Sequence, residues 1–444
     1  MLKRILSIMM SVLVYLPALS QTIKVWSLED CIRYAEEHSI SIQKQALATN
    51  RSRLALQEAR WSFVPSLSVS STFTSSTGRV LDPTTYQFVE TKFTSNNSSS
   101  VSGDIAIFEG GKKIHMLNKM KLSLEAESVK EMSIEYSLRL NVIAAYMDLL
   151  CSGEQIKVAK ESVSHIEEQM ERSLNLLDAG NITELDVLQL KSQLFAARND
   201  EYMARHNEEQ ARLTLCDLLE IEDSLSFMIA EPSPEKEYMW ISDLESAIDN
   251  HPDYKSSVIS QRIMETDYSI AKAAMYPTLS LSAGYGSSFS DARKKAIQSA
   301  DGTISYDAYP FFRQYADNAS AYVSLGIRIP IFTGCITTNN IKRAKIAIAE
   351  SQLATAEVRK QLRKQIIQAQ IDCEAARNKY LLKQEEAHYA DEARRQMNEK
   401  YNVGLTDYYG WYSALLESVK AKYSLIESKY EYFFKCETLK VYYL

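Results

Sequence analysis

The sequence predicts a mainly α-helical chain with four β-strands, in which the strands close into a transmembrane barrel only together with further copies of the chain. Three observations predict this fold class: glycine and proline are scarce, the few that occur are placed in duplicate, and the hydrophobic period switches between those of strand and helix. The chain has 13 glycines and 9 prolines among 444 residues, roughly 5% where about 12% is usual. Because turns depend on these residue types, the chain should consist of a few very long elements.

Two long segments lack helix breakers, and each should form one very long helix. Between Gly111 and Gly180 the sequence has a single glycine, Gly153, and no proline. Between Gly334 and Gly404 it has neither residue type. At about 1.5 Å per residue, these stretches permit helices of roughly 100 Å.

The apolar residues of the first long segment step alternately by three and four positions, which is typical of a coiled-coil seam. The seam consists of Ile156, Ala159, Val163, Ile166, Met170, Ser173 and Leu177. A similar seam runs through the last helix, where Lys422 and Lys429 interrupt it. The opposite faces are polar, so these helices should pack along narrow stripes.

Short marks recur in the two halves of the chain and indicate one unit used twice. The matching pairs are residues 64–67 (VPSL) and 276–279 (YPTL), 107–110 (IFEG) and 331–334 (IFTG), and 177–180 (LDAG) and 401–404 (YNVG). The last two pairs have the same spacing, so the two long helices should be equal in length. We expect the first repeat at residues 21–231 and the second at 241–444, joined by a Pro-rich linker at 232–240.

Residues 1–20 have the pattern of a secretory signal peptide. Lys3 and Arg4 precede an apolar run that ends in Ala18, Leu19 and Ser20, with small residues where signal peptidase cleaves. We therefore expect an exported mature chain that starts near Gln21. After this segment no apolar run reaches the length of about 18 residues that a membrane-spanning helix needs.

Four segments alternate apolar and polar residues, which is the period of a β-strand. We expect the strands at about residues 66–74, 97–108, 278–286 and 320–332. Each can reach about 9–11 residues, the length at which a tilted strand crosses a bilayer. The long polar loops between the paired strands, near 75–96 and 287–318, fit the extracellular side of a membrane.

A four-stranded sheet cannot lie in lipid by itself, because its two edges would leave backbone groups without hydrogen bonds. Three copies of the chain would supply twelve strands, enough to close a barrel around a lumen. Asp104 and Arg328 occupy equivalent places in the two repeats and should face this lumen, where charge is tolerated. They could pair across adjacent strands or form a ring of charge.

The combined order of these marks resembles the TolC-like outer-membrane efflux proteins. The resemblance covers the mature chain and rests on the repeat and on residues 64–67, 276–279, 330–334 and 401–404. It implies a homotrimer whose β-barrel lies in the outer membrane of a Gram-negative bacterium and continues as a long α-helical barrel across the periplasm. It also implies a passive exit duct, without a cofactor, that docks a periplasmic adaptor and an inner-membrane transporter of the resistance-nodulation-division or ABC type.

The resemblance further implies that the turns at Gly180 and Gly404 form a periplasmic tip with a gate. Tyr401 matches the family's gating tyrosine, and Asp186 matches an acidic residue of the tip. The other tip candidates are Thr183, Thr406, Asp407, Tyr408, Tyr409 and Trp411. The simpler alternative is helix capping by the glycines and a solvated charge at Asp186.

The sequence departs from the family at two positions where members with cation-selective gates carry aspartate, which here are Gly410 and Ser413. The surrounding run is aromatic, from Tyr408 to Tyr412. We hypothesise a constriction closed by aromatic packing, with Asp407 as the nearest acid. Alternatively, these side chains only pack between helices. At the other end of the long helices, Pro65, Pro277, Gly110 and Gly334 should mark the joints between strands and helices.

Other chemistry has little support. The formal net charge of −7 disfavours a nucleic-acid partner, and the six histidines and six cysteines form no catalytic or metal-binding motif. Cys373 and Cys436 could face each other across the hairpin at Gly404. Helix axes about 8–10 Å apart often keep such Cα atoms too far apart for a disulfide, so we expect two thiols.

Two other functions stay open. One is a duct for type I protein secretion, and the other is a soluble periplasmic coiled-coil scaffold whose apolar strand face lies under a helix. The exported substrate is not predicted.

Overall fold

The structure, a computed structural model, describes residues 25–81, 88–180, 182–222, 228–231 and 243–442. The expected signal peptide at 1–20 and linker at 232–240 lie outside the described residues. The first half contains β1 (Val25–Trp26), α2 (Leu28–His38), α3 (Ile40–Trp61), β2 (Ser66–Leu81), β3 (Phe88–Glu109), α4 (Lys112–Asp178), α5 (Glu184–Leu218) and β4 (Met228–Ile229). The second half contains α6 (Leu244–Asn250), α7 (Pro252–Ala273), β5 (Thr278–Ser290), β6 (Lys294–Gln298), β7 (Ile304–Ala308), α8 (Phe311–Asp317), β8 (Ser320–Arg328), α9 (Ile336–Asn402) and α10 (Tyr408–Val441).

The two long helices are the ones that the scarcity of glycine and proline predicts. Both α4 and α9 contain 67 residues, so their equal length matches the duplicated spacing of the sequence marks. Within the described residues, none of the helices is long and apolar enough to cross a membrane.

The chain divides into two compact units, and both halves of the sequence contribute to each. The sheet unit comprises Leu47–Ser128 and Ser256–Glu357, and the helical unit comprises Met1–Ala46, Val129–Lys255 and Val358–Leu444.

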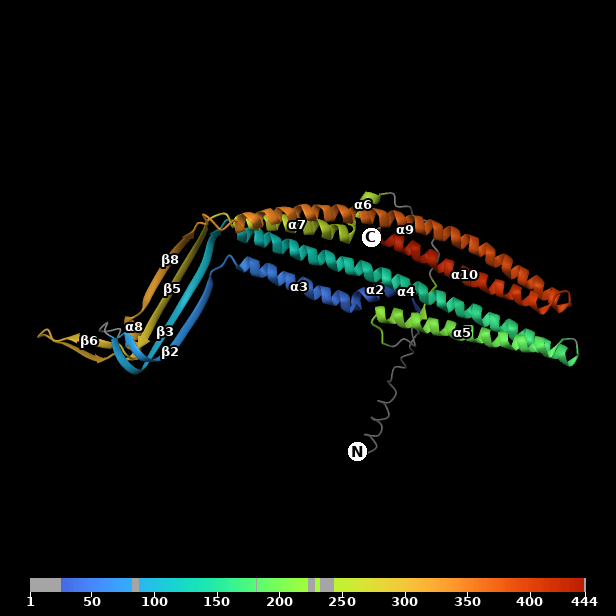
Figure 1. Cartoon of the computed structure of the whole chain (residues 1–444), viewed down its shortest axis with the longest axis horizontal. Coiled ribbons are helices and arrows are strands. Elements are labelled where there is room, and N and C mark those ends of the chain that lie inside the picture. The colour runs from blue at the N-terminus through green and yellow to red at the C-terminus, as the bar shows by residue number, and fades with distance from the viewer. Residues whose placement is uncertain (1–24, 82–87, 181, 223–227, 232–242, 443–444) are drawn as a thin grey trace, which may run out of the picture. The chain divides into compact units, whose positions relative to one another are not determined.

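The sheet unit is built on an antiparallel sheet with the strand order β2-β3-β5-β8 (Figure 1). Val101 on β3 lies opposite Val69 on β2 and Tyr285 on β5, so apolar residues gather on one face and serine, threonine and glycine on the other. The apolar face is open in the single chain: Leu67 is 76% exposed and Val323 is 77% exposed. The outer strands are β2 and β8.

Two predicted loops contain more regular structure than expected. Most of the segment near 75–96 belongs to β2 and β3, which are longer than the predicted strands at 66–74 and 97–108. These extensions are rich in serine and threonine and lack apolar alternation, so the period could not show them. On the polar face, the hydroxyls of Ser70 and Ser100 lie 2.9 Å apart, so side chains reinforce the pairing there.

The predicted loop at 287–318 is also folded, because it contains the last residues of β5 together with β6, β7 and α8. Helix α8 lies on the apolar face of the sheet: the hydroxyl of Tyr315 lies 2.9 Å from that of Ser99, and the ring of Phe311 packs 4.9 Å from that of Phe289. The predicted strand at 320–332 ends early, at Arg328. Pro330 has no N–H to continue the ladder, which accounts for this end.

The joints between strands and helices fall at the predicted prolines and glycines. Pro65 precedes β2 and Pro277 precedes β5, while Gly110 and Gly334 adopt φ values of +61° and +60°. A Cβ atom on Gly110 would also lie only 2.5 Å from the carbonyl oxygen of Ala273. This joint therefore requires glycine for two reasons: the backbone is left-handed, and a neighbouring backbone segment leaves no room for a side chain.

The core of the helical unit surrounds the middle of α4. Tyr146 is almost completely buried, and its hydroxyl donates hydrogen bonds to the carbonyl oxygens of Ala230 at 2.5 Å and Trp26 at 3.2 Å. These bonds hold the parallel pair β1–β4 against the helix. A second apolar cluster contains Val163, Ile166, Leu190, Leu194, Ala197, Trp411 and Leu415. It joins α4 and α5 to α10 near the hairpin turns.

Candidate functional site

The two hairpin turns, α4–α5 and α9–α10, lie at the same end of the helical unit (Figure 1). Gly180 and Gly404 have φ values of +77° and +76°, the left-handed conformation that glycine adopts most easily at a helix end. The N–H of Gly404 donates to the carbonyl oxygen of Tyr401 at 3.1 Å, and the N–H of Leu405 donates to that of Lys400 at 2.8 Å. Both glycines are therefore helix caps, as the capping interpretation expected.

The acidic residues of the turns begin the next helices. Thr183 and Asp186 form a capping box at the start of α5, in which Asp186 accepts hydrogen bonds from the N–H and hydroxyl of Thr183 at 3.0 and 2.8 Å. These two bonds hold the pKa of Asp186 below its usual value. Asp407 caps α10 by accepting from the N–H of Gly410 at 3.0 Å. The hydrogen bonds of Asp186 are those of a helix-capping residue. Its role in gating stays a prediction.

The cap also explains the glycine at position 410. A Cβ atom there would lie 2.6 Å from the hydroxyl oxygen of Thr406 and 3.3 Å from a carboxylate oxygen of Asp407. Because such contacts are closer than side chains tolerate, an aspartate cannot replace Gly410 without a shift of Thr406.

The aromatic run after Gly404 divides into packed and exposed members. Trp411 is only 3% exposed, its ring centroid lies 6.0 Å from those of Tyr401 and Tyr408, and its Nε1–H donates to Asn398 at 3.1 Å. Tyr409 is 62% exposed. The packing interpretation therefore describes Trp411, while Tyr409 keeps a free aromatic surface near the turn.

Hydrogen bonds connect the two hairpins near their ends. The guanidinium of Arg172 on α4 donates to the side-chain oxygen of Asn402 on α9 at 2.7 Å. The hydroxyl of Tyr409 on α10 donates to Gln189 on α5 at 3.2 Å, and that of Tyr412 donates to Gln193.

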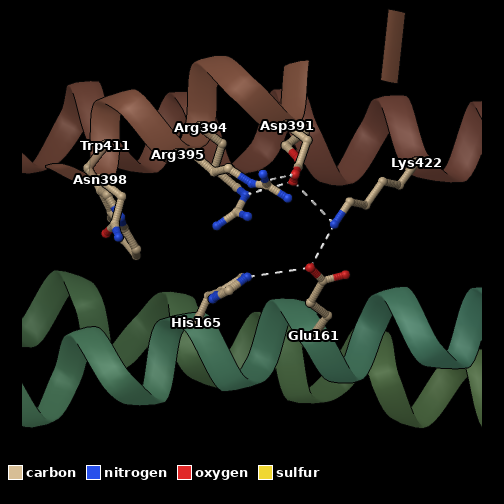
Figure 2. A network of polar contacts seen from close by, with 9 residues as sticks. Glu161, His165, Asp391, Arg394, Arg395, Asn398, Trp411 and Lys422 are labelled. Atoms are coloured by element: carbon tan, nitrogen blue, oxygen red, sulfur yellow. Dashed lines mark hydrogen bonds and ion pairs between the residues drawn. The ribbon is translucent and has the colours of Figure 1, made fainter. Parts of the chain in front are cut away.

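Further from the turns, charged side chains from three helices form a network (Figure 2). Lys422 on α10 lies between two carboxylates, with its Nζ atom 2.7 Å from Oε1 of Glu161 on α4 and 3.4 Å from Oδ1 of Asp391 on α9. Asp391 also forms ion pairs with Arg394 and Arg395, each with a nitrogen–oxygen distance of 3.1 Å. Lys422 is therefore an ionic link between the α4–α5 hairpin and the α9–α10 hairpin.

The network keeps both carboxylates ionised. Burial alone would raise the pKa of Asp391, but the hydrogen bond from Arg394 and the charge of Lys422 outweigh burial and lower it. Burial would likewise raise the pKa of Glu161, but the hydrogen bond from Lys422 outweighs burial and lowers it. Because both folded values lie below the unfolded values near 4, the two groups stabilise the fold above that pH. The stabilisation is lost as pH falls through the lowered values.

The sequence pattern of the outer membrane efflux protein family matches residues 31–219 and 244–440. This chain belongs to that family. The matched ranges cover both repeats and hold every hairpin and network residue described above.

Relatives and solved structures agree with the family. Over 248 residues the chain is 23% identical to the outer membrane efflux protein BepC of Brucella suis biovar 1, a match that covers 55% of this chain and 49% of BepC. It is 25% identical over 184 residues to the pyoverdine export outer membrane protein OpmQ of Pseudomonas aeruginosa, which covers 40% of this chain and 38% of OpmQ. The chain thus aligns with about half or less of the length of these relatives.

The fold is that of a solved channel. The outer membrane channel CmeC of Campylobacter jejuni superimposes with a TM-score of 0.79 at 16% sequence identity, covering 94% of this chain and 85% of CmeC. This similarity shows that the efflux-family chain has the TolC-like fold.

The charged strand residues of this efflux-family chain share the polar face of the sheet. Asp104 lies opposite Ser282, which lies opposite Ser324, and Arg328 follows Ser324 by four residues on the same strand. Both charges therefore lie on the serine-rich face, as the predicted strand register requires. They lie on β3 and β8, which β5 separates, so they cannot pair across adjacent strands within one chain.

The charged network could not be predicted from the sequence. Glu161, Asp391 and Arg394 lie on helix faces rich in similar residues, so nothing singles them out. Only Lys422 could have been singled out from the sequence, because it interrupts an apolar seam of the last helix. Among the described residues, no group of three or more His, Cys, Asp or Glu side chains could hold a metal ion.

Replacing the central lysine should weaken the helical unit in a pH-dependent way. We expect Lys422→Met to cost roughly 1–2 kcal/mol at pH 7, allowing for partial exposure of the charges, because Glu161 then loses its lysine partner and Asp391 keeps only the two arginines. At pH 3 the cost should shrink as the carboxylates become protonated. Thermal unfolding followed by circular dichroism checks this. Lys420→Met, two residues earlier on an exposed face of α10, is the control, and an equal effect of both variants would contradict the assignment.

Proposed function

We propose that the chain is one protomer of a homotrimeric channel in the outer membrane of a Gram-negative bacterium. The channel is the exit duct of a tripartite efflux pump and docks a periplasmic adaptor and an inner-membrane transporter. The observation that carries the proposal is the four-stranded sheet, with its exposed apolar face and its outer strands β2 and β8.

Lipid and neighbouring copies together account for this sheet. The apolar face, with Leu67, Val69 and Val323 largely exposed, is stable in contact with acyl chains. The edge of β8 pairs with β2 of the next copy, so that three sheets close without an open edge. The serine-rich face with Asp104 and Arg328 then lines the lumen.

The helical unit also carries apolar surface for neighbouring copies. On α5, Leu185 and Phe195 are about three-fifths exposed, and on α9 Leu382 and Tyr389 are exposed to a similar or greater extent. In the proposed assembly these side chains face neighbouring copies. Contact with adjacent copies in a helical barrel covers them.

A soluble scaffold fits this arrangement less well. That alternative requires a helix over the apolar strand face, and the part of the chain that the structure describes places only α8 there, against the middle of β3 and the last residues of β5. Leu67, Val323 and Leu325 stay exposed. A duct for type I secretion has the same fold, and the identity of the transporter partner separates it from drug efflux.

A matched pair of substitutions on β8 tests insertion into the membrane. Leu325 lies on the apolar face and Ser324 on the polar face. Leu325→Arg should strongly reduce the amount of assembled channel, because arginine on a lipid-facing strand position costs about 2–4 kcal/mol near the bilayer centre. Ser324→Arg, on the lumen side, should assemble normally. Outer-membrane fractionation and heat-modifiable migration on denaturing gels measure both. Recovery of the parent protein in the soluble periplasm would overturn the channel.

The charged network is the proposed latch of the periplasmic gate. Lys422 holds the α9–α10 hairpin against Glu161 of α4, which keeps the turn at Gly404, with the exposed ring of Tyr409, in its inward position. Contact with the adaptor breaks this link and lets the hairpin move outward.

Channel recordings test the latch separately from assembly. In planar bilayers, we expect channels of Lys422→Met to conduct several-fold more than the parent, while Lys420→Met channels conduct like the parent. The reason is that the first substitution removes the cation that bridges Glu161 and Asp391, and the second removes an exposed charge. Unchanged conductance of assembled Lys422→Met channels would exclude the latch and leave the channel itself standing.

A further inference from the structure

Two cysteines meet between α9 and α10 at about equal distances in sequence from the turn at Gly404. The Sγ atoms of Cys373 and Cys436 lie 3.0 Å apart, about 1 Å more than the length of a disulfide bond. Cys373 is completely buried and Cys436 is half-buried. The spacing of these helices therefore does not keep the two thiols apart, contrary to the expectation from average helix distances.

Contacts on both sides fix the register of the two helices at this point. Asp372 and Lys435, the residues directly before the two cysteines, form an ion pair of 3.1 Å. Toward the turn, Lys379 pairs with Glu431 at 2.7 Å. The rings of Tyr380 and Tyr432 stack nearby, with centroids 6.1 Å apart. A bond between the sulfurs therefore requires only a small side-chain adjustment.

The two thiols differ in exposure, as a stepwise oxidation requires. A hydrogen bond from Cys373 lowers the pKa of Cys436 and outweighs burial, which opposes it; a further hydrogen bond with Tyr432 acts in the same direction. Half-buried Cys436, whose thiol ionises more readily than an ordinary cysteine, is thus the one that an oxidant reaches first. Buried Cys373 is placed to attack second.

We propose that Cys373 and Cys436 form a disulfide after export, an inference that takes only the exported location from the proposed function. The Cys436 thiolate attacks the disulfide of a thiol oxidase in the oxidising compartment, which forms a mixed disulfide and releases one thiolate of the oxidase. The Cys373 thiolate then attacks Sγ of Cys436 and releases the second. The chain loses two protons and two electrons, and the oxidase disulfide becomes two thiols.

The bond staples α9 to α10 and leaves the end of the hairpin free. Asp391, Lys422 and the turn at Gly404 all lie on the turn side of the bridge. With the bridge closed, α10 cannot slide along α9, so the two helices move together when the link between Lys422 and Glu161 breaks. The bridge also closes a chain segment between cysteines 63 positions apart, which restricts the unfolded chain and so favours the folded one.

Peptide mapping tests the bridge directly. Protein purified from the outer membrane without reductant is denatured, alkylated with iodoacetamide and digested with trypsin. We expect residues 365–377, which contain Cys373, to be linked to residues 436–440, and the linked species to disappear on reduction. Recovery of both peptides in fully alkylated form would overturn the proposal.

Thermal unfolding provides a second readout. Reductant should lower the melting temperature of the parent by several degrees, and Cys436→Ser should melt at this lower temperature whether or not reductant is present. Cys335→Ser, at an exposed cysteine of the same chain, should behave like the parent. A parent that does not respond to reductant would contradict the staple. Neither readout measures transport, so a linked peptide in a protein that forms no channel would refute the proposed function and leave the bridge intact.

Discussion

The edges of the four-stranded sheet impose the constraint on which the rest of the structure depends. Strands β3 and β5 have partners on both sides, whereas β2 and β8 form the borders. Backbone N–H and C=O groups at a border need water or another strand, and hydrocarbon supplies neither. The apolar side chains of the same sheet nevertheless require an apolar environment. The arrangement that we propose, in which copies of the chain join border to border, satisfies both demands and makes the polar face the lining of the lumen.

The helical part of the molecule uses two kinds of contact at different levels. Near the turns, aromatic packing around Trp411 and hydrogen bonds such as that from Arg172 to Asn402 connect the hairpins. Further along, the link is ionic and passes through one side chain, Lys422. Burial strengthens an ion pair but raises the cost of removing one partner, so a lysine between two carboxylates suits the latch that we propose. Packing around Trp411 has no comparable single point of failure.

Much of the fold could be predicted from the sequence, because its signals are local. The absence of helix breakers determines two helices of 67 residues, and alternation places Asp104 and Arg328 on the polar face. The extensions of β2 and β3 escaped prediction because serine and threonine runs carry no hydrophobic period. Helix α8 was missed because its support comes from distant residues such as Ser99. The charged network could not be predicted for the same reason. Glu161, Asp391 and Lys422 are far apart in sequence, and only the packing of three helices brings them together.

Amide hydrogen exchange of β2 and β8 tests the central claim most directly, because it reports on the sheet borders themselves. In channels extracted from the outer membrane, the account predicts that border amides are protected as strongly as those of β3 and β5, since each border is paired with a neighbouring copy. Rapid exchange confined to β2 and β8, in protein whose β3 and β5 amides are protected, would show that the borders are open and would contradict closure by further copies.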